Sequence, residues 1–306
     1  MAQESNLIVI LGATASGKTQ VGVRIARVLN GEVISADSRQ VYRGMDVGTG
    51  KDLKEYGEIP YHLIDILDPG YEFSVFEFQR RFVSAFLDIQ GRGKLPILVG
   101  GTGLYLEAVL KVYRFVEVPQ NPELRSELEL LSLEELARRL KAIHPFLHNT
   151  TDLRQRERMI RAIEIAQFKD DPSKQPSLPD LSPIVFGIRW PREVLCQRIT
   201  RRLRERITLG MIEEIKRLHK AGVSFENLDF YGLEYRYGAM YLRGTLTKND
   251  FFQKLNSAIH QFAKRQETWF RRMERQGTRI HWVAGDRDPA GKILEMLEKE
   301  RSKVDF

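Results

Sequence analysis

Eight residues near the N-terminus limit the folds open to this chain more than any other stretch. Residues 12–19 read Gly-Ala-Thr-Ala-Ser-Gly-Lys-Thr, and they follow the apolar run Leu7–Leu11. A helical pattern comes next, with Val21, Ile25 and Leu29 on one face. A strand, a G-x-x-x-x-G-K-[ST] segment and a helix, in this order, are typical of a phosphate-binding loop. The sequence therefore predicts an α/β fold that binds a polyphosphate.

The positions of this loop have separate physical roles. Glycines let backbone N–H groups turn inward around phosphate oxygens, and the helix N-terminus adds a partial positive charge. Lys18 is expected to reach the distal phosphates, and the hydroxyl of Thr19 to hold Mg²⁺. The alternative, a glycine-rich turn with a chance lysine, is disfavoured by the flanking strand and helix. The predicted diphosphate- or nucleotide-binding residues are Gly12, Ala13, Thr14, Ala15, Ser16, Gly17, Lys18 and Thr19.

Composition narrows the class of protein. A chain of 306 residues, 42% of them hydrophobic, can bury a sizeable core. The net charge of +7 favours a polyanionic partner such as nucleic acid. No apolar run approaches the roughly 20 residues of a membrane span, and the first residues lack a signal-peptide pattern. Cys196 is the only cysteine, so an intramolecular disulfide and a multi-cysteine zinc site are excluded. We expect a cytoplasmic monomer without a membrane partner.

Apolar runs and helical patterns alternate along most of the chain, which predicts a mostly parallel sheet with helices on both faces. The expected strands are Leu7–Leu11, Val33–Ser35, Ile97–Val99, Ile184–Ile188 and Arg279–Val283. Residues 116–168 carry helical pattern alone, and the proline-rich stretch 169–183 is expected to be a loop. We therefore predict an α/β core of residues 1–115 and 180–306, and a helical insertion domain of residues 116–179.

The sequence also predicts where some helices begin and which of their faces are apolar. Capping boxes at Ser74–Glu77 and Ser132–Glu135 predict two helix starts. The first helix carries Phe78, Phe82, Phe86 and Ile89 on one side, and the second carries Leu133, Leu136, Leu140 and Ile143. A long final helix is expected from about Phe251 to Met273, with Phe252, Leu255, Ile259 and Phe262 on its apolar face. Near its end, Trp269 and Phe270 are interpreted as core aromatics rather than RNA-stacking residues.

Two polar segments are expected beside the phosphate-binding loop. Asp37 comes just after the second strand, and Gly100–Gly103 follows the third. Ligands of open α/β sheets bind beyond the carboxyl ends of the strands, so Asp37, Thr102 and the loop should share one rim. A carboxylate there could be a general base, a Mg²⁺ ligand or a loop cap, and spacing alone does not rank these three roles.

Arginines are dense in two helices. Arg154, Arg158 and Arg161 form one stripe in the insertion. The other group is Arg198, Arg201, Arg202, Arg204 and Arg206. Like charges at i, i+4 repel each other, and only Glu157 and Glu205 lie nearby in sequence to offset them. This favours contact with phosphates over a solvated face.

These motifs together resemble the tRNA dimethylallyltransferase family, the bacterial tRNA isopentenyltransferases. The family's loop reads G-P-T-A-S-G-K-T, from which this chain differs only at Ala13. Further blocks that match in order are Ala36–Asp46, Gly48–Lys51, His62–Asp65, Gly100–Tyr105, Arg161–Glu164, Ala263–Gln266 and Thr268–Arg271. The similarity extends from about Leu7 to Arg272.

The resemblance implies a P-loop α/β core with a helical insertion that contacts tRNA. The implied reaction transfers a dimethylallyl group from dimethylallyl diphosphate to N6 of the adenosine just 3′ of the anticodon, with Mg²⁺ as cofactor and the anticodon stem-loop of tRNA as partner. Asp37 resembles the general base, and Thr19 and Arg202 resemble the pair that stabilises the diphosphate. The tRNA-contacting positions implied are Asp37, Ser38, Arg39, Gln40, Thr102, Glu157, Arg158, Met159, Ile160 and Arg161.

The chain also departs from the family pattern. The family's R-V-D-x-M reads Arg202-Leu-Arg-Glu-Arg206 here, and its G-Y-K-E reads Gly232-Leu-Glu-Tyr235. A T-R pair before Ala263 is replaced by Ile259-His260. These changes spare the loop and Asp37.

Two other functions are compatible with the same loop. A small-molecule kinase would turn over ATP. A non-catalytic RNA-binding protein would keep its function in the Asp37→Ala variant.

Overall fold

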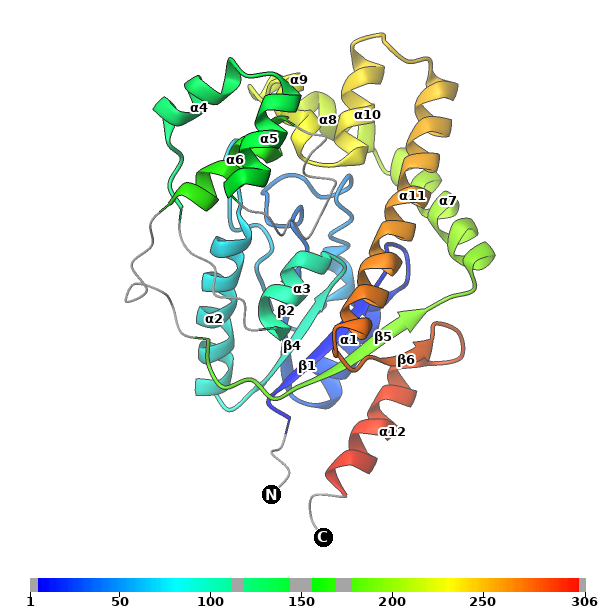
Figure 1. The fold of residues 1–306 in the computed structure, drawn as a ribbon. Coiled ribbons are helices and arrows are strands. Elements are labelled where there is room, and N and C mark those ends of the chain that lie inside the picture. Colours follow the sequence, from blue (N-terminus) through cyan, green and yellow to red (C-terminus); the bar gives the residue numbers. More distant parts are fainter. Residues whose placement is uncertain (1–4, 112–117, 144–155, 169–177, 303–306) are drawn as a thin grey trace. The chain divides into compact units, whose positions relative to one another are not determined.

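One parallel sheet organises the computed structural model, which describes residues 5–111, 118–143, 156–168 and 178–302 (Figure 1). The strand order is β3-β2-β4-β1-β5-β6, and every pairing between neighbours is parallel. The strands are β1 Leu7–Gly12, β2 Gly31–Ala36, β3 Tyr61–His62, β4 Leu95–Gly100, β5 Pro183–Arg189 and β6 His281–Ala284. The prediction of a mostly parallel sheet is confirmed. The strand β3 was not predicted, because two residues are too few to show a period.

Alternate residues of the buried strands point to opposite faces of the sheet, as pleating requires. Leu7 and Val9 pack with the helices α2, α3 and α11, whereas Ile8 and Ile10 pack with α1 and α12. The bounds are α1 Lys18–Val28, α2 Val75–Gly91, α3 Gly103–Leu110, α11 Lys248–Arg275 and α12 Pro289–Arg301. The sheet is thus covered on both faces, which is why its strands are apolar throughout.

A second group of helices follows β5 in the sequence and packs around α11. It comprises α7 Arg192–Thr208, α8 Met211–Lys220, α9 Phe225–Phe230 and α10 Leu233–Leu242. Apolar residues of α7, α8 and α10 belong to the same buried cluster as Leu7 and Val9. A short 3-10 helix, η1 Leu53–Glu55, lies in the segment after β2. These helices carry side chains to the end of the sheet where the loop lies.

Residues 114–177 form a compact unit of their own, and residues 1–113 and 178–306 form the other. The described part of the smaller unit contains α4 Pro122–Glu129, α5 Leu133–Ile143 and α6 Arg156–Gln167. Its buried core consists of Leu128, Leu136, Leu140, Met159, Ile160 and Ile163. Arg154 and residues 169–177 of the predicted proline-rich loop lie outside the described residues.

Both predicted helix starts are confirmed, and the second has both hydrogen bonds of a capping box. The N–H of Glu77 donates to the hydroxyl of Ser74 at 3.1 Å, and α2 buries all four predicted apolar residues. At the start of α5, the N–H of Glu135 donates to the hydroxyl of Ser132 at 3.3 Å, while the Glu135 carboxylate accepts the Ser132 N–H at 2.8 Å. Reciprocal capping of this kind fixes where a helix begins.

The prediction for the long helix was partly wrong. α11 is not the final helix, because α12 follows β6. Phe262 is 38% exposed, whereas Ala263 is buried. The buried stripe runs at intervals of four residues from Phe251 through Ala263, so Phe262 falls beside it. Trp269 and Phe270 pack against the core cluster, as interpreted from the sequence.

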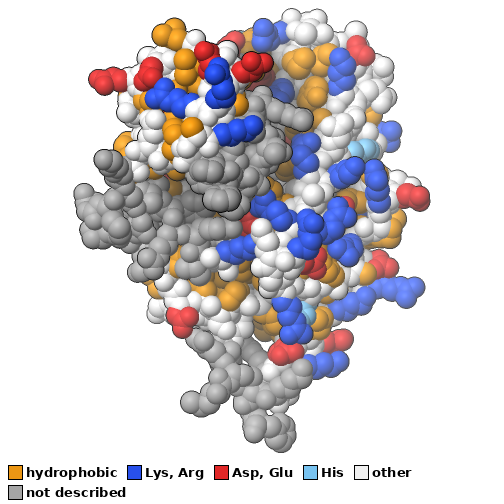
Figure 2. Space-filling view, in the orientation of Figure 1, with side chains coloured by type: hydrophobic (Ala, Val, Ile, Leu, Met, Phe, Trp, Pro, Cys, Tyr) orange, Lys and Arg blue, Asp and Glu red, His pale blue; other side chains and the backbone are white. Residues whose placement is uncertain are grey.

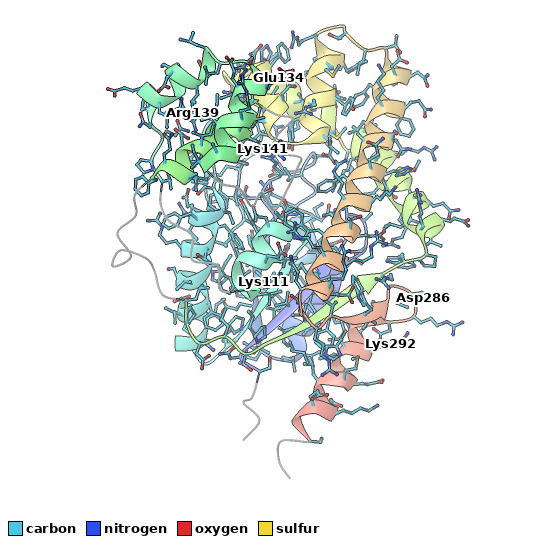
Figure 3. All side chains as sticks on the ribbon, viewed as in Figure 1. Lys111, Glu134, Arg139, Lys141, Asp286 and Lys292 are labelled. Carbon is cyan, nitrogen blue, oxygen red and sulfur yellow. The ribbon has the colours of Figure 1, made fainter. Side chains whose placement is uncertain are left out.

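Charged side chains connect α3 to α11. The carboxylate of Glu107, which is 1% exposed, lies 3.4 Å from Nζ of Lys111 and accepts a hydrogen bond from Arg272 Nη2 at 2.6 Å (Lys111 is labelled in Figure 3). α11 is thereby fixed against the helix that begins at the rim. Within the described residues, no helix is both long enough and apolar enough to cross a membrane.

Candidate active site

Three chain segments leave neighbouring strands at one edge of the sheet. β4 lies between β2 and β1, and Gly100 is in register with both Ala36 and Leu11. Asp37, Thr102 and the phosphate-binding loop therefore begin side by side at the carboxyl ends of their strands. The structure confirms the predicted shared rim, where open α/β sheets bind their ligands.

The loop has the backbone shape that anion binding needs. Gly17 has a φ of 88° and caps α1, a conformation that favours glycine. The N–H of Ser16 turns back to the carbonyl of Ala13 at 3.2 Å. Because the first N–H groups of a helix have no partner inside it, those that open α1 are directed toward the space in front of the loop. The hydroxyl of Ser16 is buried and has no hydrogen-bond partner among the described residues, so it too can donate to a phosphate oxygen.

Side chains from distant parts of the sequence fix the loop. Gln266 of α11 accepts the N–H of Thr14 at 2.8 Å and donates to the carbonyl of Gly101 at 2.9 Å. Arg198 Nε donates to the carbonyl of Ala15 at 2.9 Å. Trp190 Nε1 donates to the carbonyl of Ser16 at 2.9 Å, and the Arg198 guanidinium lies 4.3 Å from the centre of the Trp190 ring. No local sequence pattern predicts this role of Gln266, although the residue ends one of the family-like blocks.

Lys18 lies in a crowded electrostatic environment. Its Nζ is 3.4 Å from the carbonyl of Ala13. Burial lowers its pKa to about 8, while Asp37 opposes this shift and Arg202 and Arg206 add to it. The lysine, the carboxylate after β2 and two arginines of α7 therefore act within one electrostatic field.

Asp37 is half-buried at the start of a tight turn. Its Oδ1 accepts the N–H of Arg39 at 2.9 Å. Thr102 Oγ1 accepts the N–H of Ser38 at 3.3 Å, which connects the two segments of the rim. A carboxylate has two oxygens, so a cap made by Oδ1 is compatible with proton transfer at Oδ2. Gln40 is 9% exposed and donates to the carbonyl of Gly50 at 3.3 Å.

The segment between Asp46 and Asp52 is held by buried charges whose roles were not predicted from the sequence. Lys51 is 1% exposed and donates to the Tyr42 carbonyl and to the carboxylates of Asp46 and Asp65. The carboxylate of Glu214 accepts the N–H groups of Asp46, Val47 and Gly48 at 2.8 to 2.9 Å. This segment lies against α7, where it contacts Arg202 and Arg206.

The predicted absence of offsetting charge beside the arginines was wrong. Arg202 pairs with Asp52, and Arg206 Nη1 lies 3.4 Å from Oε1 of Glu234. Each of these partners is at least 28 residues away in sequence, so local spacing could not reveal it. Arg201 lies 3.7 Å from Glu205, which the sequence did suggest.

The insertion residues divide into two groups by burial. Met159 and Ile160 are 0% and 5% exposed in the core of the smaller unit, so their side chains are not available to a tRNA. Arg161 donates to the carbonyl of Val118 at 2.7 Å and to Glu164 at 3.0 Å. Glu157 and Arg158 are exposed, and their contact with tRNA stays a prediction.

Exposed cations gather over α7 and α11 (Figure 2). They include Arg201, Arg204, Lys264, Arg265 and Arg271. A surface of this kind attracts polyanions by long-range steering. Phe262 and Phe252 lie among these cations, with the guanidinium groups of Arg265 and Arg204 less than 6 Å from the two ring centres.

Known proteins share both the sequence and the fold. A family model described as IPP transferase matches residues 40–273, and one described as isopentenyl transferase matches residues 5–58. The tRNA dimethylallyltransferase 1 of Geotalea uraniireducens is 66% identical over 292 residues, which are 95% of this chain and 97% of that protein. The tRNA dimethylallyltransferase 2 of Syntrophotalea carbinolica is 62% identical over 293 residues, 95% of this chain and 98% of that one.

Solved structures agree with this result. The full-length tRNA isopentenylpyrophosphate transferase of Bacillus halodurans has a TM-score of 0.71 and 35% identity, over 99% of each chain. A eukaryotic dimethylallyltransferase acting on tRNA has a TM-score of 0.73 and 25% identity, over 92% of this chain and 74% of that one. The fold is the predicted P-loop NTPase-like α/β core with flanking helices.

Proposed function

Because this chain belongs to the IPP transferase family, we propose that it transfers a dimethylallyl group from dimethylallyl diphosphate to N6 of the adenosine immediately 3′ of the anticodon in tRNA. The observation that carries the proposal is the position of Asp37 at the same rim as the phosphate-binding loop. One rim thereby offers a proton acceptor for the amine and a cradle for the leaving group.

Asp37 is proposed as the general base. An exocyclic amine is a poor nucleophile, so its proton must leave as the new C–N bond forms. The N6 lone pair attacks C1 of the dimethylallyl group, the C1–O bond breaks with its electrons going to the diphosphate, and the N6 proton passes to the Asp37 carboxylate. Thr102 supports this role, because its hydroxyl holds the N–H of Ser38 and fixes the turn that carries Asp37.

The leaving diphosphate gains negative charge as the C–O bond breaks. The N–H groups at the start of α1, with Lys18 and Arg202, are proposed to stabilise that charge. The buried hydroxyl of Ser16 can add a further hydrogen bond. The loop backbone in front of α1 is held in place before the reaction by Gln266, Arg198 and Trp190, so its N–H groups need little reorganisation when the bond breaks.

The loop residues fit a Mg²⁺ ion that takes some of its ligands from the protein and others from the substrate. Thr19 lies in the first turn of α1, and its hydroxyl is an oxygen ligand of the kind that Mg²⁺ takes. The part of the chain that the structure describes contains no group of three or more His, Cys, Asp or Glu side chains that could hold a metal. Diphosphate oxygens and water would therefore complete the coordination, which is usual for this ion. When bound, it would neutralise charge on the diphosphate.

The tRNA is proposed to approach the surface formed by the cations of α7 and α11, with Glu157 and Arg158 as further contacts from the insertion. The target adenosine must leave the anticodon-loop stack to reach Asp37, and an unpaired loop purine costs less to extrude than a paired one. Arg39 and Gln40, which follow Asp37, are proposed to contact this nucleotide. The monomeric state and the cytoplasmic location stay predictions.

One assay tests the proposal. Purified protein is mixed with Mg²⁺, dimethylallyl diphosphate and an anticodon stem-loop that has adenosine 3′ of the anticodon, and the RNA is weighed by mass spectrometry. We expect a gain of one dimethylallyl group. Asp37→Asn should keep tRNA binding and lose at least about a hundredfold in turnover, because the amide cannot take the proton. Asp286→Asn, an exposed change in the loop after β6, is the matched control (labelled in Figure 3).

The opposite results have distinct meanings. Near wild-type turnover in Asp37→Asn would remove Asp37 from the mechanism. No gain of mass with either the stem-loop or bulk tRNA would contradict the transferase function, and ATP turnover against small acceptors would then test the kinase alternative.

A further inference from the structure

Arg206 of α7 is buried, yet its hydrogen-bonding capacity is largely unused. The residue is 9% exposed, and its Nε is buried with no hydrogen-bond partner in the part of the chain that the structure describes. Its Nη1 makes only long contacts, 3.4 Å to the carbonyl of Gly48 and 3.4 Å to Oε1 of Glu234. A guanidinium buried in this way is costly unless strong partners compensate it. The two long contacts compensate the buried positive charge only weakly, so Arg206 can accommodate an anion that binds it more strongly than Glu234 does.

Arg206 stands beside the arginine that the family resemblance assigns to the diphosphate. Arg202 and Arg206 are four residues apart on α7, and both approach Gly50 in the segment after β2. A Cβ placed on Gly50 would overlap Nη2 of Arg206 and would lie 2.8 Å from Nη2 of Arg202. Two guanidinium groups thus meet at one backbone turn, where Asp52, the partner of Arg202, offsets only part of their mutual repulsion.

The charges around this turn connect it to the phosphate-binding loop. Arg202 and Arg206 both contribute to the lowered pKa of Lys18, so their fields reach the loop lysine. Burial raises the pKa of Glu234 and Asp37 adds to this increase, whereas Arg206, a backbone hydrogen bond and Arg202 oppose it. The two arginines therefore offset only part of the cost of burying this carboxylate. A diphosphate in front of Lys18 would offer Arg206 a better partner.

The two departures from the family pattern meet in this contact. Where the family has methionine and lysine, this chain has Arg206 on α7 and Glu234 on α10. Relative to the family pattern, the positive charge lies on α7 instead of α10. A change at position 206 alone would leave two cations against each other, and a change at position 234 alone would leave a carboxylate beside methionine, so the two changes together give one ion pair.

We propose that Arg206 is a further diphosphate-binding residue of this enzyme, whose guanidinium donates to the diphosphate of the dimethylallyl donor and is held by Glu234 when no diphosphate is bound. This inference rests on the proposed function and deepens it at the same site. Arg206 would then be a third protein cation, besides Lys18 and Arg202, that stabilises the diphosphate as the C–O bond breaks. The electrons of that bond still go to the diphosphate, and Arg206 exchanges no proton with it.

The test measures binding of inorganic diphosphate with Mg²⁺ by titration calorimetry, without tRNA. We expect R206M to weaken binding at least about tenfold, since a charge-assisted bidentate donor is removed. R217M removes an exposed arginine of α8 by the same substitution and should bind as the wild type does. The double variant R206M/E234K returns a cation to α10, and it should recover most of the lost affinity.

Further measurements separate binding from packing. Thermal unfolding identifies any variant that fails to fold. E234Q keeps Arg206 and removes only the competing carboxylate, so it should bind diphosphate severalfold more tightly than the wild type. In steady-state assays, R206M should raise KM for dimethylallyl diphosphate and lower kcat, but leave KM for tRNA unchanged.

Two results would overturn the inference. If the wild type and R206M bind diphosphate equally well, Arg206 only packs against Glu234. Unchanged affinity in E234Q would likewise show that this pair does not face the diphosphate. A wild-type protein that binds no diphosphate would instead contradict the proposed function itself.

Discussion

The side-chain Oε1 of Gln266 accepts the backbone N–H of Thr14 at 2.8 Å, across 252 residues of sequence. The other half of the same amide donates to the carbonyl of Gly101 at 2.9 Å. One planar group therefore joins the turn after β1 to the turn after β4. Since Gln266 is 8% exposed, both hydrogen bonds are shielded from water and define the distance between the two turns.

Gln266→Ala should loosen the phosphate-binding loop. It leaves the N–H of Thr14 and the carbonyl of Gly101 without their partner, which costs about 1–3 kcal/mol of stability. We also expect diphosphate affinity to fall about tenfold, because the loop N–H groups lose their fixed orientation. Chemical denaturation and calorimetry with diphosphate measure the two effects.

Gln266→Glu distinguishes the two hydrogen bonds. The carboxylate can still accept the N–H of Thr14, but it cannot donate to Gly101 and it brings negative charge to the loop. Diphosphate affinity should fall further than in the alanine variant. Gln261→Ala, an exposed change on the same helix, is the control. Equal affinities in all four proteins would exclude a role for Gln266 in shaping the loop.

Local sequence patterns were sufficient to predict the rim but not its supports. The loop motif, the apolar runs and the position of Asp37 together predicted that three segments meet at one end of the sheet. Helix starts were predictable because a capping box acts within four residues. Gln266 and Glu214 were missed because their partners lie in other elements. Lys51 was missed because its partners lie 5 to 14 residues away in irregular segments, where no local period records such contacts. The face of α11 was misassigned at Phe262 for a related reason, since only packing decides which edge of an apolar stripe is buried.

Lys18 should make diphosphate binding depend on pH. Burial lowers its pKa to about 8, so in the ligand-free protein the ammonium group loses its proton as the pH rises through 8. Diphosphate favours the charged form, and affinity should therefore decline above pH 8 and be accompanied by proton uptake. Calorimetry in buffers of different ionisation enthalpy measures that uptake.

Lys18→Arg is the comparison for this experiment, because arginine stays charged between pH 7 and pH 9. The titration of diphosphate itself affects both proteins equally, so it cancels in the ratio of their affinities. The ratio of wild-type to variant affinity should drop between pH 7 and pH 9. A constant ratio would mean that Lys18 keeps its proton over the whole range.

The same shift predicts a cost in stability. The folded protein releases the Lys18 proton near pH 8, whereas the unfolded chain holds it until about 10.5, so the unfolded state binds more protons between these values. Stability contributed by this group therefore rises with pH across that window and is lowest below it. Lys18→Met should raise the unfolding temperature of the ligand-free protein at pH 7 while abolishing diphosphate binding. A lower unfolding temperature would mean that neighbouring groups already compensate the charge.

Arg158 and Arg161 should differ in tRNA binding although they lie on one helix. Arg158 is exposed, whereas Arg161 is half-buried and donates to the Val118 carbonyl and to Glu164. If Arg158 contacts a phosphate, Arg158→Ala reduces the slope of log affinity against log salt by about 0.7–0.9. Arg161→Ala should instead destabilise α6 and leave the slope nearly unchanged. Filter binding at several salt concentrations, with hydrogen exchange of α6, separates the two. An unchanged slope in Arg158→Ala would exclude a phosphate contact by that side chain.

Glu164 is expected to hold the insertion unit together above acid pH. Burial by itself would raise its pKa, but hydrogen bonds from Arg125, from the N–H of Asn121 and from Arg161 outweigh burial and lower the pKa to about 2. The folded unit thus binds fewer protons than the unfolded chain, whose carboxyl titrates near 4.5. The stability that Glu164 contributes is complete above pH 4.5 and is lost as the pH falls toward 2.

Glu164→Gln removes this charge and should destabilise the insertion unit by about 3 kcal/mol at pH 7, because Arg125 and Arg161 lose a buried partner. Hydrogen exchange of the α4, α5 and α6 amides at pH 7 and pH 2.5 measures the effect within the unit. Glu134→Gln, an exposed change on α5, is the control (Figure 3). The wild type should lose protection between the two pH values, whereas Glu164→Gln should be equally weak at both. A variant that keeps the wild-type dependence on pH would show that another carboxylate in the unit is responsible, since the amide cannot titrate.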